Sequence, residues 1–209
     1  GWQEAIYDKL NLDQVPIHPV LDPSGNRLLV EVMLRGVPTY VQVWQLRVGR
    51  VTLYLMDANV PQNTPWDREI SARLYGGDQE TRIRQETVLG LGGVRVLRAL
   101  GIAPAAWHMN EGHSSFLVLE RLRELVQAGR PFDQVRNTTV LTTHTPVPAG
   151  HDAFPFDLMD QYFGRFWPEM GISRERFMSL GQHEGRFNMT ILALRLAGRT
   201  NGVSKLHGQ

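Results

Sequence analysis

The stretch AWHMNEGHSSF, residues 106–116, places two histidines and a glutamate within six positions. Imidazole and carboxylate groups are common zinc ligands, so His108, Glu111 and His113 could serve a metallohydrolase. In the H-E-x-x-H motif, however, both rings share one face of a helix. Here the pattern predicts a strand through His108 and a polar turn before His113. We therefore expect no metal site, and the metallohydrolase remains an alternative.

Three histidines follow predicted parallel strands. His113, His144 and His207 each lie at or just beyond the carboxyl end of one, where open α/β sheets form their ligand crevice. We expect His144 and His207 to lie at a functional rim. For His113, capping of the following helix is an equal alternative.

A glycine-rich polar loop opens the helix predicted near residues 81–101. It contains Gly76, Gly77 and Asp78, and is followed by Arg82 and Arg84. One interpretation is a helix N-terminus, with the Asp78 carboxylate near the positive end of the dipole. The other is a mobile gate beside a polar ligand. Both interpretations remain open.

These residues must be positioned by two kinds of structure. Residues 22–59 alternate apolar and polar side chains between turn sequences, which predicts an antiparallel meander of about three strands. Later residues predict strand–turn–helix units, with helices near 114–129, 157–166 and 188–197. Alternation of helices and strands indicates a parallel α/β arrangement. We expect one partial domain over residues 1–209, with the meander in 1–60 and the α/β part in 61–209.

The glycines of GLGGVRVLRALG partly mimic a phosphate-binding loop, at Gly90, Gly92 and Gly93. That fingerprint needs a preceding hydrophobic strand, and the preceding GGDQETRIRQET is polar and helix-forming. Because each glycine inside a helix costs about 1 kcal/mol relative to alanine, close packing against another backbone is the better explanation.

The composition narrows the function classes. Lys+Arg number 22 and Asp+Glu 21, so the net charge of +1 indicates neither nucleic acid nor a charged surface as partner. No apolar run could span a membrane. The absence of cysteine excludes disulfides and thiolate chemistry, and agrees with a cytoplasmic location. The start GWQEAIYDKLN lacks an initiator Met, so we expect a piece of a longer protein.

Four stretches in order resemble the α-glucan (glycogen/starch) phosphorylases, most of all their shorter bacterial and archaeal members. They are LYGGDQETRIRQETVLGLGG, WHMNEGHSSFLVLERL, TTHTPVPAGHDAF and FNMTILALRLAGRTNGVSKLHG. The resemblance implies part of the N-terminal Rossmann-like domain of a GT-B glycosyltransferase. It also implies cleavage of an α-1,4-glucan by inorganic phosphate to give glucose 1-phosphate. Such a piece would expose apolar surface, so a homo-oligomer is a further expectation.

The resemblance also assigns roles. His207 and His144 match histidines on two sides of the glucose at the catalytic subsite, and Tyr75–Glu80 matches a loop that gates substrate entry. The residues implied on the substrate side are Tyr75, Gly76, Gly77, Asp78, Asn110, Glu111, His113 and Thr143.

The family cofactor, pyridoxal phosphate, is held on a lysine of a C-terminal domain that this chain lacks. Lys9 and Lys205 do not match that lysine, so we expect the isolated chain to be inactive. The alternatives are a non-catalytic glucan-binding or regulatory module of the same ancestry, and part of a glucan synthase.

Overall fold

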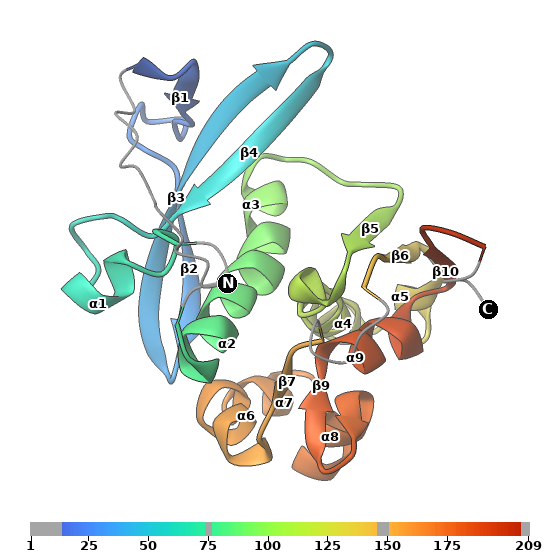
Figure 1. The fold of residues 1–209 in the computed structure, drawn as a ribbon. Helices are drawn as coiled ribbons and strands as arrows, with labels where there is room; N and C mark the ends of the chain where they lie inside the picture. Colours follow the sequence, from blue (N-terminus) through green and yellow to red (C-terminus); the bar gives the residue numbers. More distant parts are fainter. Residues whose placement is uncertain (1–13, 74–76, 146–150, 206–209) are drawn as a thin grey trace, which may run out of the picture.

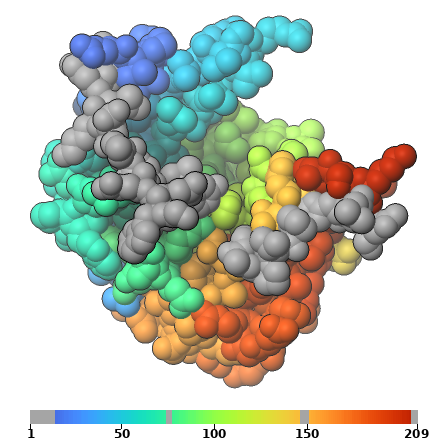
Figure 2. Space-filling view, viewed as in Figure 1, coloured from blue at the N-terminus to red at the C-terminus, as the bar shows by residue number. Residues whose placement is uncertain are grey.

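The computed structural model describes residues 14–73, 77–145 and 151–205 (Figure 1). Three sheets joined by helices make up this part of the chain. The expected α/β class, with an antiparallel meander followed by parallel strands, is confirmed, while the GT-B architecture remains a prediction. Figure 2 shows the cyan residues near 40–55 at the top of the molecule and the orange residues near 155–190 at the bottom.

The meander contains β2 (Leu29–Leu34), β3 (Val37–Val48) and β4 (Val51–Asp57), with the short β1 (Ile17–Pro19) added to it. β3 pairs antiparallel with all three other strands. Alternate residues of β2, such as Val30 and Val32, are buried, as the alternating pattern predicted. The β2–β3 turn consists of Arg35 and Gly36, both at positive φ, which suits a tight hairpin.

The β3–β4 hairpin extends away from the helices (Figure 1). Val48 pairs with Val51 there, and Leu46 pairs with Leu53, so their side chains share one face. Val48, Val51, Leu53 and Leu55 are all exposed. The described part of the chain therefore presents apolar surface on this hairpin.

A continuous helical segment packs on the meander. After the single turn α1 (Pro65–Arg68), it comprises α2 (Gln79–Thr87), the π-helical η2 (Val88–Gly92) and α3 (Gly93–Ala99). Ile83, Leu91 and Val94 are buried, as the helical spacing predicted. Gly101, at φ 69°, ends the segment in the left-handed conformation expected of a C-terminal glycine.

The parallel sheet has the order β10–β6–β5, with β5 (Trp107–Asn110), β6 (Thr139–Thr143) and β10 (Arg199–Gly202). β5 leads through the 3₁₀ turn η3 (Gly112–Ser114) to α4 (Leu117–Gln127), and α5 (Gln134–Asn137) precedes β6. α9 (Met189–Leu196) leads into β10. Trp107, Met109 and Leu141 are buried on one face of this sheet.

The segment after residue 151 differs from the sequence prediction. A small antiparallel sheet, β7 (Ala153–Phe154), β9 (Arg186–Asn188) and β8 (Gln182–His183), was not expected. The helix predicted near 157–166 is divided into α6 (Phe156–Phe163) and α7 (Phe166–Glu169), and α8 (Arg174–Gly181) follows. Phe116, Phe163 and Phe187 belong to the buried aromatic core that joins this segment to α4. None of the described helices is long and apolar enough to cross a bilayer.

The predicted close packing of the glycines is confirmed at Gly90. A Cβ atom there would lie 2.6 Å from the Phe116 Cβ and 2.8 Å from the Leu117 backbone nitrogen. Gly93, in the same helical segment, has only the tip of Met56 at 4.0 Å. One glycine is thus required by a close approach of two helices, whereas the other is not.

We predict that Gly90→Ala lowers the free energy of unfolding by about 1–3 kcal/mol, because α4 must move to admit the methyl group. Gly93→Ala is the matched control and should be neutral or stabilising by up to about 1 kcal/mol, because alanine is the better helix former. Urea unfolding followed by far-UV circular dichroism measures both. Equal effects of the two substitutions would contradict this account of the packing.

Candidate functional site

The turn that follows β5 begins with a strained residue. Glu111 has φ 66° and ψ −176°, a region of the backbone map used almost only by glycine. Such a conformation costs about 1–3 kcal/mol and persists only where surrounding contacts enforce it. The Glu111 N–H donates to the Thr142 carbonyl at 2.9 Å, which continues the pairing with β6 beyond the strand.

The Glu111 side chain binds the exit of β6. One carboxylate oxygen, Oε1, accepts hydrogen bonds from the backbone N–H groups of His144 and Thr145, the latter at 2.8 Å, and from the Thr143 hydroxyl at 3.4 Å. Burial, which leaves Glu111 only 8% exposed, opposes ionisation of this group. The backbone hydrogen bonds outweigh it and hold the pKa of Glu111 below its ordinary value, so the carboxylate is charged.

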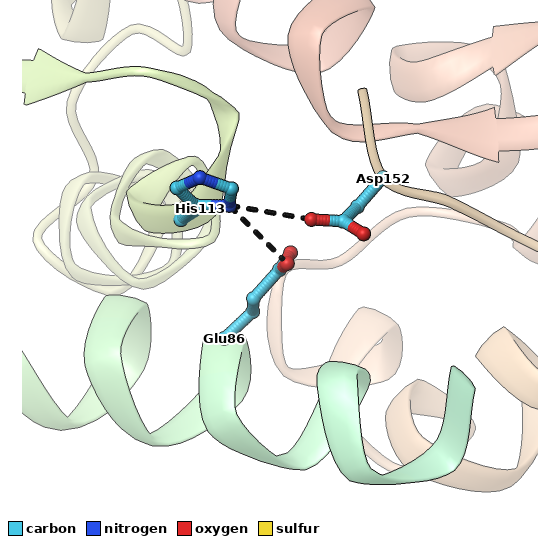
Figure 3. Close-up of side chains that lie close together, drawn as sticks. All are labelled: Glu86, His113 and Asp152. Atoms are coloured by element: carbon cyan, nitrogen blue, oxygen red, sulfur yellow. Dashed lines mark hydrogen bonds and ion pairs between the residues drawn. The ribbon is translucent and has the colours of Figure 1, made fainter. Parts of the chain in front are cut away.

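Next to this turn, four charged or titratable side chains meet. Figure 3 shows Glu86 of α2 and Asp152, just before β7, both directed toward His113 of η3. The His113 Nδ1 lies 3.2 Å from an Asp152 oxygen and 3.8 Å from Glu86 Oε1. Arg82, one helical turn before Glu86, forms ion pairs with both Glu86 and Asp152. Three segments distant in sequence are thus joined by this cluster.

The environment shifts the pKa of each acid or base in the cluster. Burial raises the pKa of Glu86, which is 2% exposed, to about 8. Its Oε2 is buried with no hydrogen-bond partner among the described residues, which also disfavours the anion. Hydrogen bonding to Asp152 raises the pKa of His113 to about 9. Burial opposes ionisation of Asp152, but hydrogen bonds from His113 and Arg82 outweigh it and lower its pKa.

Carboxylate and imidazole groups are common metal ligands, so this cluster suggests a metal site other than the His108, Glu111 and His113 set considered from the sequence. One atom from each of Glu86, His113 and Asp152 lies within 4.8 Å of the others. The Arg82 Nη2, however, lies 3.1 Å from both Glu86 Oε1 and His113 Nδ1 and contacts Asp152. The guanidinium therefore occupies the position that a cation would need.

The metal site considered from the sequence is also not assembled. His108 Nε2 lies 2.7 Å from the Thr142 hydroxyl, on the face of the sheet away from the core. The Glu111 carboxylate accepts backbone N–H groups after β6, and the His113 ring contacts the Asp152 carboxylate. The three side chains have three different partners, so they do not form a common ligand set.

A cavity of about 480 Å³ lies beside the charged cluster. Its polar walls include Arg82, Glu86, Asn110 and His113, and further lining comes from Arg73 before α2. Its apolar walls come from β4, η2 and Ile70 (Tyr54, Leu55, Met56, Ile70, Val88 and Leu89). A polar molecule with one apolar face would match such a lining.

The structure brings together five of the ten residues selected from the sequence. Asn110, Glu111 and His113 lie at the β5 exit, and Thr143 and His144 at the β6 exit beside it. The positions predicted for His113 and His144, after the carboxyl ends of parallel strands, are confirmed. Tyr75, Gly76 and His207 lie outside the described residues.

The loop before α2 has a structural role in its described part. Asp78 is the N-cap of α2, and its carboxylate accepts the Thr81 N–H at 2.9 Å. Gly77 adopts φ 91° against the Thr81 side chain, a conformation that glycine provides. Of the two arginines noted beyond it, Arg82 faces the site, whereas Arg84 pairs with Asp67 of α1.

Sequence reasoning missed Glu86 and Asp152 as site residues. The i, i+4 spacing of Arg82 and Glu86 places both on one face of the helix, so the sequence did indicate that these two side chains could pair. Nothing in the sequence indicated that Asp152, in the stretch PAGHD, would meet that face.

The described residues do not fit pyridoxal phosphate. A Schiff base needs a lysine, and the one lysine in the described ranges, Lys205, is exposed just after β10. No step of a reaction through this cofactor can therefore be assigned to these residues.

Comparison with known proteins tests the resemblance to α-glucan phosphorylases. Maltodextrin phosphorylase of Thermococcus litoralis is 42% identical over 213 residues, which cover 100% of this chain. Glycogen phosphorylase of Mycobacterium tuberculosis is 44% identical and also covers 100% of it. Glycogen phosphorylase of Aquifex aeolicus is 39% identical and covers 99%. No family model matches the chain.

The chain is similar along its whole length to part of an α-glucan phosphorylase. This confirms the resemblance carried by the four motifs. The chain spans 25%, 26% and 31% of the lengths of these three phosphorylases, that is, about a quarter to a third. The turn after β5 and the exit of β6 thus lie in a region shared with phosphorylases of two bacteria and an archaeon.

The cluster makes stability depend on pH. Glu86 and His113 both have raised pKa values, about 8 against 4.5 and about 9 against 6.5, so the folded protein binds more protons than the unfolded chain. Their contribution to stability is complete below the unfolded values and is lost as pH rises toward the folded ones.

We predict that Glu86→Gln removes the part of this loss that falls between about pH 4.5 and 8. One such proton changes the free energy of unfolding by at most about 1.4 kcal/mol per pH unit. Urea unfolding of both proteins at several pH values measures the difference. Parallel stability curves for the two proteins from pH 5 to 8 would show that Glu86 titrates at an ordinary pKa.

Proposed function

We propose that this chain forms part of the glucose-binding region of an α-1,4-glucan phosphorylase, which converts glucan and inorganic phosphate to glucose 1-phosphate. Identity of 39–44% along nearly the entire chain to maltodextrin and glycogen phosphorylases carries the proposal. The geometry supports it, because motif residues far apart in sequence gather at neighbouring strand exits.

The site suits a sugar. Sugar hydroxyls both donate and accept hydrogen bonds, and the described rim offers the Asn110 amide, the His113 ring and the Arg82 guanidinium beside one cavity. His144 is exposed at the adjacent strand exit, and its ring makes no hydrogen bond with another described residue. In this proposal the His144 imidazole contacts the glucose at the catalytic subsite. A sugar hydroxyl left without such a partner costs about 1–3 kcal/mol, which gives selectivity.

The remaining roles belong to the proposal alone. His207 approaches the same glucose from another side, and Tyr75, Gly76, Gly77 and Asp78 belong to the loop that admits substrate. In this proposal a further domain of the GT-B enzyme would hold pyridoxal phosphate, and the cofactor would supply acid–base chemistry at the substrate phosphate. The protein acts in the cytoplasm, without nucleic acid or membrane as partner, and homo-oligomer formation is part of the same proposal.

A second candidate is a glucan-binding module without catalysis. This function needs no cofactor lysine, and the one lysine among the described residues, Lys205, is exposed after β10. A sugar-nucleotide-dependent glucan synthase shares the implied architecture, and its donor differs from that of a phosphorylase.

The test compares this chain with the complete polypeptide that contains it. Each is incubated with maltoheptaose, inorganic phosphate and pyridoxal phosphate, and glucose 1-phosphate is measured. We expect product from the complete polypeptide and none from the chain alone. Glucose 1-phosphate from the chain alone would refute the need for a further domain. Glucan extension from a nucleotide sugar, without phosphorolysis by the complete polypeptide, would refute the phosphorylase in favour of a synthase.

Matched histidine variants of the complete polypeptide locate the site. His144→Ala should lower kcat/KM for phosphorolysis by about 10–100-fold, the value of one lost buried hydrogen bond. His183→Ala, an exposed histidine of β8, should leave it unchanged. Equal effects of the two variants would place the sugar elsewhere.

A further inference from the structure

The turn from Asn110 to His113 holds both ends of the connection that runs from Thr145 to Asp152. At the first end, the Glu111 carboxylate accepts the backbone N–H groups of His144 and Thr145. At the second end, His113 lies 3.2 Å from the Asp152 carboxylate. One short turn therefore contacts the chain where it leaves the parallel sheet after β6 and again just before β7.

Glu111 is an unusual residue for its backbone conformation. At φ 66° and ψ −176° a glycine would be free of strain, and Gly112 is the next residue in the chain. A side chain in this conformation needs compensating contacts. The three donors to Oε1 come from three consecutive residues, Thr143 to Thr145, and they provide that compensation.

The engaged oxygen of Glu111, Oε1, has little capacity left to bind a ligand as well. The residue is 8% exposed, and the atom that accepts hydrogen bonds already has three donors. His144 shows the opposite situation, because its backbone is fixed while its imidazole is exposed. The direction of that imidazole depends on the backbone that Glu111 holds.

We propose that Glu111 is a positioning residue, which fixes the backbone at the exit of β6 and so directs the His144 imidazole toward the bound glucan. The proposal rests on the proposed function for the identity of the ligand, but not for the hydrogen bonds themselves. It replaces the expectation from the sequence that Glu111 binds substrate directly.

The first test measures amide hydrogen exchange on the chain itself, without any activity. Glu111→Gly removes the carboxylate and the strain together, and the amides of His144 and Thr145 should then exchange about tenfold faster or more. The amides of Met109 and Leu141, within β5 and β6, should keep their rates. Unchanged exchange at His144 and Thr145 would overturn the proposal.

Two further variants make the result specific. Glu184→Gly is the matched control, since Glu184 also has a positive φ of 48° but its side chain is 85% exposed. It should leave the exchange at residues 144 and 145 unchanged. Glu111→Gln keeps an acceptor oxygen without charge, so its exchange rates should lie between those of the wild type and Glu111→Gly. If Glu111→Gly does not fold, this intermediate acceleration in Glu111→Gln decides the question, and its absence overturns the proposal.

The second test measures phosphorolysis of maltoheptaose by the complete polypeptide. A positioning role predicts that Glu111→Gly lowers kcat by about tenfold or more with little change in KM, and that Glu111→Gln restores much of it. A raised KM with unchanged kcat would show that Glu111 contacts the glucan directly and would overturn the proposal. If even the wild type forms no glucose 1-phosphate, the proposed function fails, whereas the exchange measurement still decides the role of Glu111.

Discussion

The hydrogen bonds between the Glu111 carboxylate and the backbone of His144 and Thr145 connect two adjacent strand exits, and the candidate site depends on them. They outweigh two costs, the burial of a charged carboxylate and a backbone conformation suited to glycine. Hydrogen bonds to a charged group are worth about 1.5–3 kcal/mol each, so two or three of them can offset strain of about 1–3 kcal/mol. They hold the backbone of residues 144 and 145 against the turn that follows β5.

A second constraint acts at the other end of the same segment. Arg82 and His113 face the carboxylate of Asp152, and Glu86 lies beneath them on α2. Burial raises the pKa of Glu86 and hydrogen bonding to Asp152 raises the pKa of His113, so the environment favours the protonated form of both groups. The Arg82 guanidinium thus occupies the position that a metal ion would take. On the cavity side, Arg82, Asn110 and His113 can offer hydrogen-bond donors to a ligand.

The sequence allowed prediction of those features that depend on local patterns. Alternation in β2 and helical spacing at Ile83, Leu91 and Val94 identified the meander and the long helical segment. The presence of a glycine at position 90, inside a helical segment, was correctly interpreted as close packing against another segment. The exits of β5 and β6 were placed correctly because parallel strands end at a common edge.

The features that escaped prediction depend on contacts between distant residues. Short strands such as β7 and β8 have two residues each, too few for any periodic pattern. Asp152 joins the site only because β7 pairs with β9 and brings it beside α2. Glu111 has the residue type of a ligand-binding group, and only the structure shows that its Oε1 already accepts from two backbone N–H groups and one hydroxyl.

The central claim is that the neighbouring exits of β5 and β6 face a glucan, with Glu111 as support and His144 as contact. A crystal structure of the complete polypeptide with a bound maltooligosaccharide tests it most directly. The account predicts a sugar hydroxyl within hydrogen-bond distance of the His144 ring, with Glu111 still bound to the backbone of residues 144 and 145. A sugar hydroxyl on the Glu111 carboxylate, or a glucan bound away from these two strand exits, would contradict it.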